Sequence, residues 1–536
     1  MTRIAEPAAQ KHRMSIWGYA IFAVTFVFLV IRVLVDKRVR EYDALDDYFH
    51  AGEWFTANVN RLADVPFDTF TIHGGKDLLP AMVLEWIYGY PTYIGAMIPT
   101  IKVFTPIIGG LVLLILLFRF APQPKAALFL APFAVFAGAY VDHRDLAIFV
   151  FMLAFFALLS GPLRPRQWSL LLFSAAVVFS IIYSMNRGAI TIGVTVPAVL
   201  WLSLREPRYL LVFVYVGAMW VLTGLLQPQF APVHVIENIL FLVGTTHIHV
   251  ADTAIETDAV IRKIYLAVAY VLMLALSGLR FLSGDRGVQN QTRLLVLGIL
   301  AAGFYEIGSN RIAWPYFGTG GLFVPIALAH WWHWFQEQGG KATRLEGAIL
   351  ITLAAMAIVM NAMLSGIKEW TWFPWLGFVL AHVALIAAAI GSFDLASLRS
   401  RAWVAWLRFA ATCGVALVVL AFLLRILTGF QSHVESGRLA AYMSWENFDA
   451  MGTPNADVVW VRDQLFDAGA TCILDMTNSG MLNAHSRLPT CSRISYFFYA
   501  DSTYEDELIA ALEDADQPVI VYSSTYGGRI SLGSRC

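Results

Sequence analysis

The chain has 536 residues, of which 58% are hydrophobic and only 14% charged, and its formal net charge is −1. This composition excludes an ordinary soluble enzyme, and the near-zero charge leaves no bulk basic surface for nucleic acid. A helix needs about 20 apolar residues to cross the hydrocarbon layer of a membrane, and apolar stretches of roughly that length recur along the chain. The sequence therefore predicts a polytopic membrane protein built mainly of helices.

The N-terminus begins with a short basic segment and continues into an apolar stretch near residues 16–35. A secretory signal peptide would end in a small-residue cleavage site, and none follows this stretch. We therefore expect it to remain as the first membrane span.

Apolar stretches bounded by charged or turn residues give about thirteen predicted spans in total. They lie near residues 16–35, 98–119, 126–141, 146–161, 169–184, 188–204, 209–226, 264–281, 293–305, 319–336, 345–363, 376–391 and 404–426. The predicted fold class is thus a mainly α, polytopic membrane helical bundle over residues 1–427, with a first outside loop at about 36–97.

The loops between these spans alternate in charge. Basic residues gather in every second loop, at 119–125, 164–166, 205–208, 280–293, 341–344 and 399–401. The other loops hold isolated charges of mixed sign. Because short cytoplasmic loops are enriched in Lys and Arg, this pattern predicts a cytoplasmic N-terminus, and an odd number of spans then places the C-terminal region outside.

Residues 428–536 have the composition of a soluble domain. The segments ADVVWVRDQLFDAG and YEDELIAALEDAD predict helices, and TCILDM and QPVIVYSS predict strands, an alternation typical of a small α/β domain with a parallel sheet. The region also holds Cys472, Cys491 and Cys536. A Cys472–Cys491 disulfide would fit an oxidising outside compartment, and buried reduced thiols are the alternative.

The first outside loop opens with an acidic segment, REYDALDDYFHAGEWF. In a helix, Asp43, Asp46, His50 and Glu53 would share one face. Such a cluster can bind a divalent cation such as Mg or Mn, here through Asp46 and Asp47, or supply a general base. A solvated acidic loop is the simpler alternative.

Further polar groups fall on the same predicted face of the membrane. Lys76 follows two glycines that permit a tight turn, and a lysine can meet a phosphate as a point charge. The turn Asp142–Asp145 carries four ionisable residues between apolar helices, where such residues serve function or pair with one another. A surface lysine and a structural Arg–Asp pair are the respective alternatives.

Two Asn-Arg pairs follow outside ends of predicted spans, Asn186-Arg187 and Asn310-Arg311. The arginine fork matches phosphate geometry, and anchoring to lipid headgroups is the alternative role. The candidate substrate- and phosphate-binding residues on this face are His50, Glu53, Lys76, His143, Arg144, Arg187, Asn310 and Arg311.

Taken together, the chain resembles the GT-C superfamily of polytopic membrane glycosyltransferases, which use polyprenyl-phosphate sugars. The resemblance rests on the Asp46-Asp47 motif within YDALDDYFHAGEW, on Asp142 and Asp145 in the next outside turn, and on the span count with a closing outside domain. It implies Asp46 or Asp47 as the catalytic base, and Asp142 or Asp145 as a group that positions the acceptor or a metal. Arg187, Arg311 and Lys76 would neutralise the departing phosphate.

The resemblance further implies transfer of a hexose or pentose from a polyprenyl-phosphate-linked donor to a glycan, lipid or protein acceptor, with inversion of the anomeric centre. The expected location is the bacterial inner membrane, in cell-envelope glycan biosynthesis. Two alternatives remain open: a polymerase or ligase for undecaprenyl-linked glycans, and a lipid-linked glycan transporter or flippase. Few ionisable residues within the predicted spans weigh against the transporter.

Overall fold

The computed structural model describes residues 16–35, 52–63, 75–120, 145–240, 288–310, 426–454, 456–475, 480–492 and 505–521, with scattered positions between 267 and 282 and at 349, 423 and 424. The spans predicted near 126–141, 319–336 and 376–391 lie outside these residues. Those predicted near 264–281, 345–363 and 404–426 are described only at scattered positions.

Within this part of the chain, three helical stretches are long and apolar enough to cross a membrane, by length and composition: Ile16–Leu34, Thr92–Leu116 and Pro207–Leu226. They correspond to helix α1 (Ile16–Leu34), to most of α6 (Thr92–Phe120), and to the short 3-10 helix η3 (Pro207–Leu210) continued by α11 (Leu211–Leu226). Another short 3-10 helix, η4 (Pro228–Phe230), follows. These three stretches mark the chain as an integral membrane protein.

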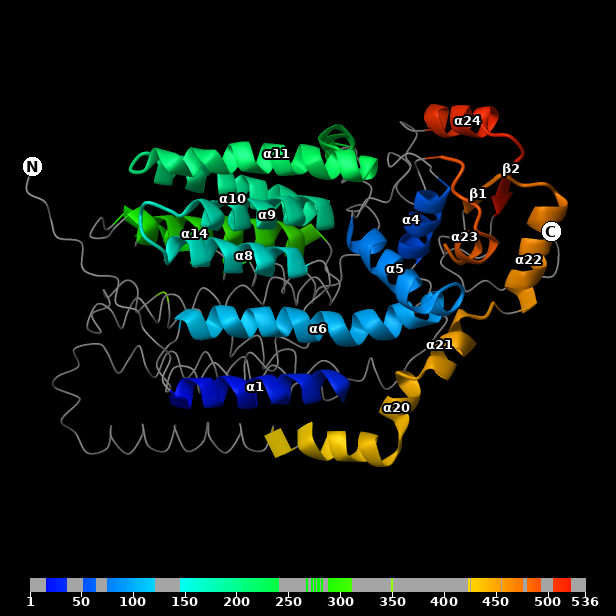
Figure 1. Cartoon of the computed structure of the whole chain (residues 1–536), viewed down its shortest axis with the longest axis horizontal. Coiled ribbons are helices and arrows are strands. Elements are labelled where there is room, and N and C mark those ends of the chain that lie inside the picture. The colour runs from blue at the N-terminus through cyan, green and yellow to red at the C-terminus, as the bar shows by residue number, and fades with distance from the viewer. Residues whose placement is uncertain are drawn as a thin grey trace, which may run out of the picture.

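Other predicted spans also form helices, namely α8 (Leu146–Leu159), α9 (Gln167–Tyr183), α10 (Met185–Ser203) and α14 (Val288–Asn310). Figure 1 shows them running side by side with α6 and α11 as a bundle, and α1 lies along α6.

Helix α8 lies at the centre of this bundle. Its sequence is apolar on all sides, as expected of a helix surrounded by others, and it contacts α6, α9, α10 and α14. Phe151 and Phe155 stack with 5.8 Å between their ring centroids. Both rings also pack on Phe173 of α9, at 5.7 and 5.0 Å. This aromatic core packs the middle of α8 against the middle of α9.

Two helices from the first outside loop cap one end of the bundle. They are α4 (Gly52–Leu62) and α5 (Gly75–Tyr88), which pack on each other. Helix α5 also contacts α6 and α9, so this described part of the predicted first outside loop lies against the spans.

The C-terminal region forms α20 (Arg438–Tyr442), α21 (Trp445–Gly452), α22 (Ala456–Asp467), β1 (Cys472–Asp475), α23 (Met481–Ser486), α24 (Glu505–Asp514) and β2 (Pro518–Val521). The strands pair in parallel, with Cys472 opposite Pro518 and Asp475 opposite Val521. Both strands and helices α22 and α24 lie where the sequence predicts them. Residues 426–435 are helical and cross the predicted domain boundary at 427/428.

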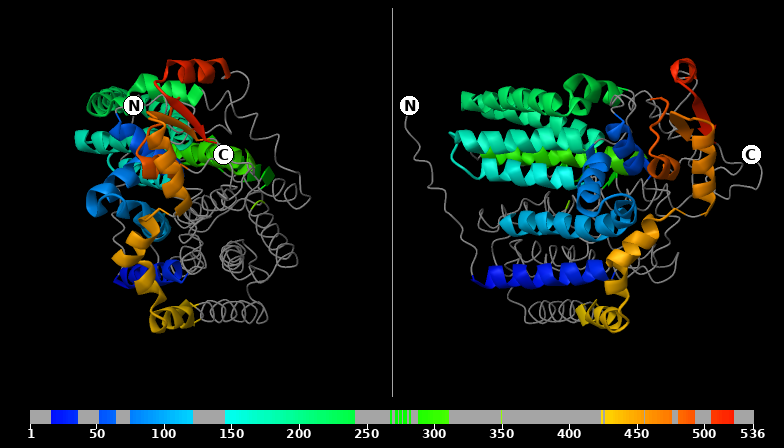
Figure 2. Two further views of the ribbon diagram at one scale, coloured as in Figure 1. Left: turned by 90° about the vertical axis from the view of Figure 1, so that its right-hand side faces the viewer. Right: turned by 45° about the vertical axis from the view of Figure 1, so that its right-hand side comes forward.

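These C-terminal elements lie at the same end of the bundle as α4 and α5. The right-hand view in Figure 2 shows the α/β elements gathered there. Helix α21 packs on α6, and α23 packs on α4. At the α6–α21 contact, a Cβ on Gly95 would overlap the carbonyl oxygen of Phe448. Only glycine permits so close an approach of the two backbones.

Candidate functional site at one end of the bundle

The predicted site residues are described to different extents. Glu53 lies in the first turn of α4, Lys76 lies in the first turn of α5, and Asn310 is the last residue of α14. Lys76 therefore belongs to the start of a helix and does not lie in the loop that the two glycines suggested. The predicted residues Asp46, Asp47, His50, Asp142, His143, Arg144 and Arg311 lie outside the described residues.

The structure brings together two predicted site residues, Asp145 and Arg187. Asp145 precedes α8 and Arg187 lies in the first turn of α10, and both are almost fully buried. The Nε and Nη2 atoms of Arg187 donate to Oδ1 of Asp145 at 3.1 and 3.0 Å. The sequence suggested a structural Arg–Asp pair as the alternative role for the Asp142–Asp145 turn, but the arginine that pairs with Asp145 comes from α10, outside that turn.

Three helix ends meet around this ion pair. The Ser180 hydroxyl of α9 donates to the carbonyl oxygen of Ala147 in α8 at 3.0 Å. At Gly188 in α10, an added Cβ would lie 2.5 Å from the Cα of Ile181 in α9. The starts of α8 and α10 and the end of α9 therefore meet at one place, and the charged pair is held within it.

A second polar cluster, which we call the Glu85 cluster, joins the first outside loop to the C-terminal region. It comprises Asn58, Arg61, Glu85, Tyr90 and Arg487. The Asn58 amide donates to Glu85 Oε2 at 2.5 Å, and Arg61 donates through Nε and Nη2 to Asn58 Oδ1 at 3.3 and 3.0 Å. Arg487 Nη1 donates to Glu85 Oε1 at 2.8 Å, and its guanidinium carbon lies 4.8 Å from the centre of the Tyr90 ring.

The sequence analysis missed this cluster. Glu85 is a single carboxylate in the apolar segment LLPAMVLEWIY, which is a signal of a required partner. Nothing in the local sequence around Arg487 indicates that it is this partner.

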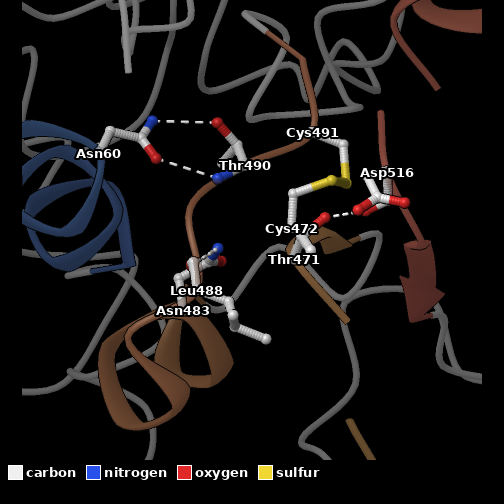
Figure 3. The surroundings of a disulfide bond; sticks show 8 residues. All are labelled: Asn60, Thr471, Cys472, Asn483, Leu488, Thr490, Cys491 and Asp516. Atoms are coloured by element: carbon white, nitrogen blue, oxygen red, sulfur yellow. Dashed lines mark hydrogen bonds between the residues drawn. A yellow bond between two sulfur atoms is a disulfide. The ribbon is translucent and has the colours of Figure 1, made fainter. Parts of the chain in front are cut away.

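A third contact joins α4 to the segment beside the disulfide. Asn60 is buried in α4; its amide nitrogen donates to the Thr490 hydroxyl, and its carbonyl oxygen accepts from the Thr490 backbone N–H, each at 3.0 Å (Figure 3). Thr490 precedes Cys491, which is bonded to Cys472 on β1. This disulfide confirms the pairing considered from the sequence.

The segment 489–491 also pairs with β1 through its backbone. The N–H of Ile473 donates to the Pro489 carbonyl at 2.9 Å, and the N–H of Cys491 donates to the Ile473 carbonyl at 3.3 Å. The disulfide and these bonds together present Thr490 to α4.

His485 of α23 lies buried close to this segment. Burial, with a smaller contribution from the positive charge of Arg462, lowers the pKa of His485 to about 4. Its imidazole is therefore neutral at pH 7, and its backbone carbonyl accepts a hydrogen bond from the Tyr90 hydroxyl at 3.0 Å. Among the residues that the structure describes, no group of three His, Cys, Asp or Glu side chains is placed to hold a metal ion. The predicted cation ligands Asp46 and Asp47 lie outside the residues that the structure describes.

The described helices form a membrane bundle, and polar contacts join the first-loop helices and the C-terminal region at one end of it. No protein-family model and no curated protein matches the chain. One similar solved structure is that of ArnT from Cupriavidus metallidurans bound to undecaprenyl phosphate, which is 14% identical to this chain. The alignment covers 88% of this chain and 85% of ArnT with a TM-score of 0.41, a likeness that by itself assigns neither fold nor function.

Proposed function

We propose that this protein is a polyprenyl-phosphate-dependent membrane glycosyltransferase of the GT-C type, acting at the outer face of the membrane. The observation that carries the proposal is the position of α4. This helix begins at Gly52, five positions after Asp47, and is packed against α5 and α23 at the end of the bundle where the disulfide lies. Five residues span at most about 18 Å, so chain connectivity sets an upper limit on the distance between the acidic motif and the start of α4.

This placement suits a lipid-linked donor. The polyprenyl tail stays in the hydrocarbon layer while its phosphate lies at the level of the lipid headgroups. A site at the outer ends of the spans can meet the phosphate and the sugar at once, and it requires no nucleotide-binding fold. Positive side chains near it, with Lys76 and Arg311 as candidates, would stabilise the negative charge that develops on the departing phosphate.

Each remaining candidate has a proposed role. Asp46 or Asp47 takes the proton from the attacking acceptor hydroxyl, whose oxygen bonds to the anomeric carbon as the polyprenyl phosphate departs from the opposite face. This single displacement inverts the anomeric carbon. Asp142 orients the acceptor, or a divalent cation if the reaction requires one. The buried Asp145–Arg187 pair fixes the residue that precedes α8, three positions after Asp142 in the sequence.

The proposal is tested by donor consumption with purified protein in lipid nanodiscs. The substrates are polyprenyl-phosphate-linked hexoses and pentoses, supplied with and without EDTA. We expect one of these donors to be consumed, and Asp46→Asn or Asp47→Asn to lower the rate by about 10²–10⁴-fold, the usual contribution of a general base. The matched control is Asp463→Asn, which removes an exposed carboxylate on α22.

The outcomes also separate the alternatives. If no donor is consumed and both Asp variants support growth like the wild type, the glycosyltransferase proposal fails. A transporter would move the lipid-linked glycan without covalent change and would tolerate Asp46→Asn. A polymerase or ligase that relies on arginines would lose activity in Arg311→Gln while tolerating Asp46→Asn and Asp47→Asn.

A further inference from the structure

We infer that the disulfide-closed segment 472–491 is a positioning element for the first outside loop, and that Arg487 and Thr490 are positioning residues which act through α4 and α5. The inference rests on the proposed function, because the loop carries the proposed catalytic base. It assigns to the C-terminal region the role of positioning the loop that carries this base.

Helix α4 is held in place by apolar packing and by hydrogen bonds. Its apolar side is buried, with Phe55 packed edge-on against Tyr93 of α6 at 6.2 Å. Asn58 and Asn60, which are two positions apart and so point to nearly opposite faces of the helix, are also buried. A buried amide requires hydrogen-bond partners, since an unsatisfied one costs free energy.

The C-terminal segment supplies the hydrogen-bond partner of Asn60 and fixes the partner of Asn58. Thr490 satisfies both ends of the Asn60 amide. Asn58 donates to Glu85, whose other carboxylate oxygen accepts from Arg487. Asn60 and Thr490 are 430 positions apart in the sequence, and Glu85 and Arg487 are 402 positions apart. These contacts therefore fix α4 and α5 only while the C-terminal segment is docked.

The disulfide determines the shape of this segment. It links Cys472 on β1 to Cys491, beside Thr490, and closes a loop that contains α23 and Arg487. Arg487 ends α23 with a φ of 62°, a left-handed conformation that is costly for a residue other than glycine. That conformation, held by the closed loop, aims the Arg487 guanidinium at Glu85 and the Tyr90 ring.

The experiment combines two measurements on the full chain in nanodiscs. Hydrogen exchange of residues 52–62 reports how firmly α4 is held, and kcat and KM for the donor report the reaction. The variants are Arg487→Gln, Arg487→Lys, Asn60→Ala and the double Cys472→Ser/Cys491→Ser. Arg462→Gln is the control, because Arg462 pairs with the adjacent exposed Asp463 on α22, away from the contacts to α4 and α5.

We expect Arg487→Gln, Asn60→Ala and the double Ser variant to speed exchange in α4 by about tenfold. They should lower kcat by about tenfold and change the donor KM by less than about twofold, because a displaced base impairs the chemical step more than donor binding. Arg487→Lys should recover most of kcat, and Arg462→Gln should match the wild type.

The inference is overturned if Arg487→Gln and Asn60→Ala leave exchange in α4 unchanged, or if they speed exchange while kcat stays at the wild-type value. Its failure differs from failure of the proposed function. An inactive wild type with no donor consumed would contradict the glycosyltransferase, whereas an active wild type matched by Arg487→Gln contradicts only the positioning role.

Discussion

At the scale of single residues, the buried Asp145–Arg187 pair makes a direct prediction. Removing one partner of a buried ion pair leaves an uncompensated charge, which typically costs about 3–5 kcal/mol. We expect Arg187→Ala to lower the thermal midpoint strongly in detergent, and Arg208→Ala to change it little, because the Arg208–Glu206 pair is exposed at the arginine.

Arg187→Lys separates the structural role of this pair from phosphate binding. A folded Arg187→Lys protein with wild-type turnover would support the structural pair. A folded protein that has lost donor turnover, with an unchanged thermal midpoint, would instead assign Arg187 to the phosphate.

The lowered pKa of His485 predicts that the stability of the protein depends on pH. Its pKa in the folded protein, about 4, lies below the usual 6.5, so the unfolded chain binds a proton more readily than the folded one between these values. Stability should therefore fall as the pH drops from 6.5 towards 4, by up to about 3 kcal/mol, and should not depend on this residue above pH 6.5. Thermal unfolding at pH 7.5 and pH 5 measures the loss, which His485→Gln should reduce; an equal loss in that variant would show that other groups are responsible.

At the scale of elements, the α6–α21 contact depends on Gly95. A methyl group there would meet the backbone of α21 at Phe448 and Gly452. Backbone atoms cannot move aside as the end of a flexible side chain can. Overpacking of this kind costs about 1–3 kcal/mol, so Gly95→Ala should lower the thermal midpoint and speed proteolysis of residues 438–452. Gly193→Ala is the control, since a Cβ there meets nothing within 4 Å; equal behaviour of the two variants would contradict the close packing.

The elements also show what the sequence could predict. Helices α8, α9 and α10 lie at the predicted spans because their apolar composition alone determines them. Helix α6 begins at Thr92 and not near residue 98, because its first turns are buried against α21, a contact that no local pattern reveals. The Cys472–Cys491 bond followed from the predicted compartment, whereas Glu85–Arg487 and Asn60–Thr490 join residues too distant in sequence to be paired by inspection.

At the scale of the whole molecule, the bonded cysteines, α4 and α5 lie at one end of the bundle, which we propose to be the extracytoplasmic end. Alkaline phosphatase folds only outside the cytoplasm, since it needs disulfides. A fusion after residue 536 should therefore be active, and a fusion at residue 165, between α8 and α9, should be inactive. The reverse pattern would contradict the predicted orientation.

The central claim is that the protein breaks the bond between a sugar and a polyprenyl phosphate. Mass spectrometry of the lipid products tests it most directly, with purified wild-type protein, a polyprenyl-phosphate-linked sugar and an acceptor extract. We predict that free polyprenyl phosphate appears together with an equal amount of glycosylated acceptor, and that Asp46→Asn or Asp47→Asn abolishes both. Recovery of the lipid-linked sugar intact under conditions in which the protein carries it across the membrane would contradict the claim.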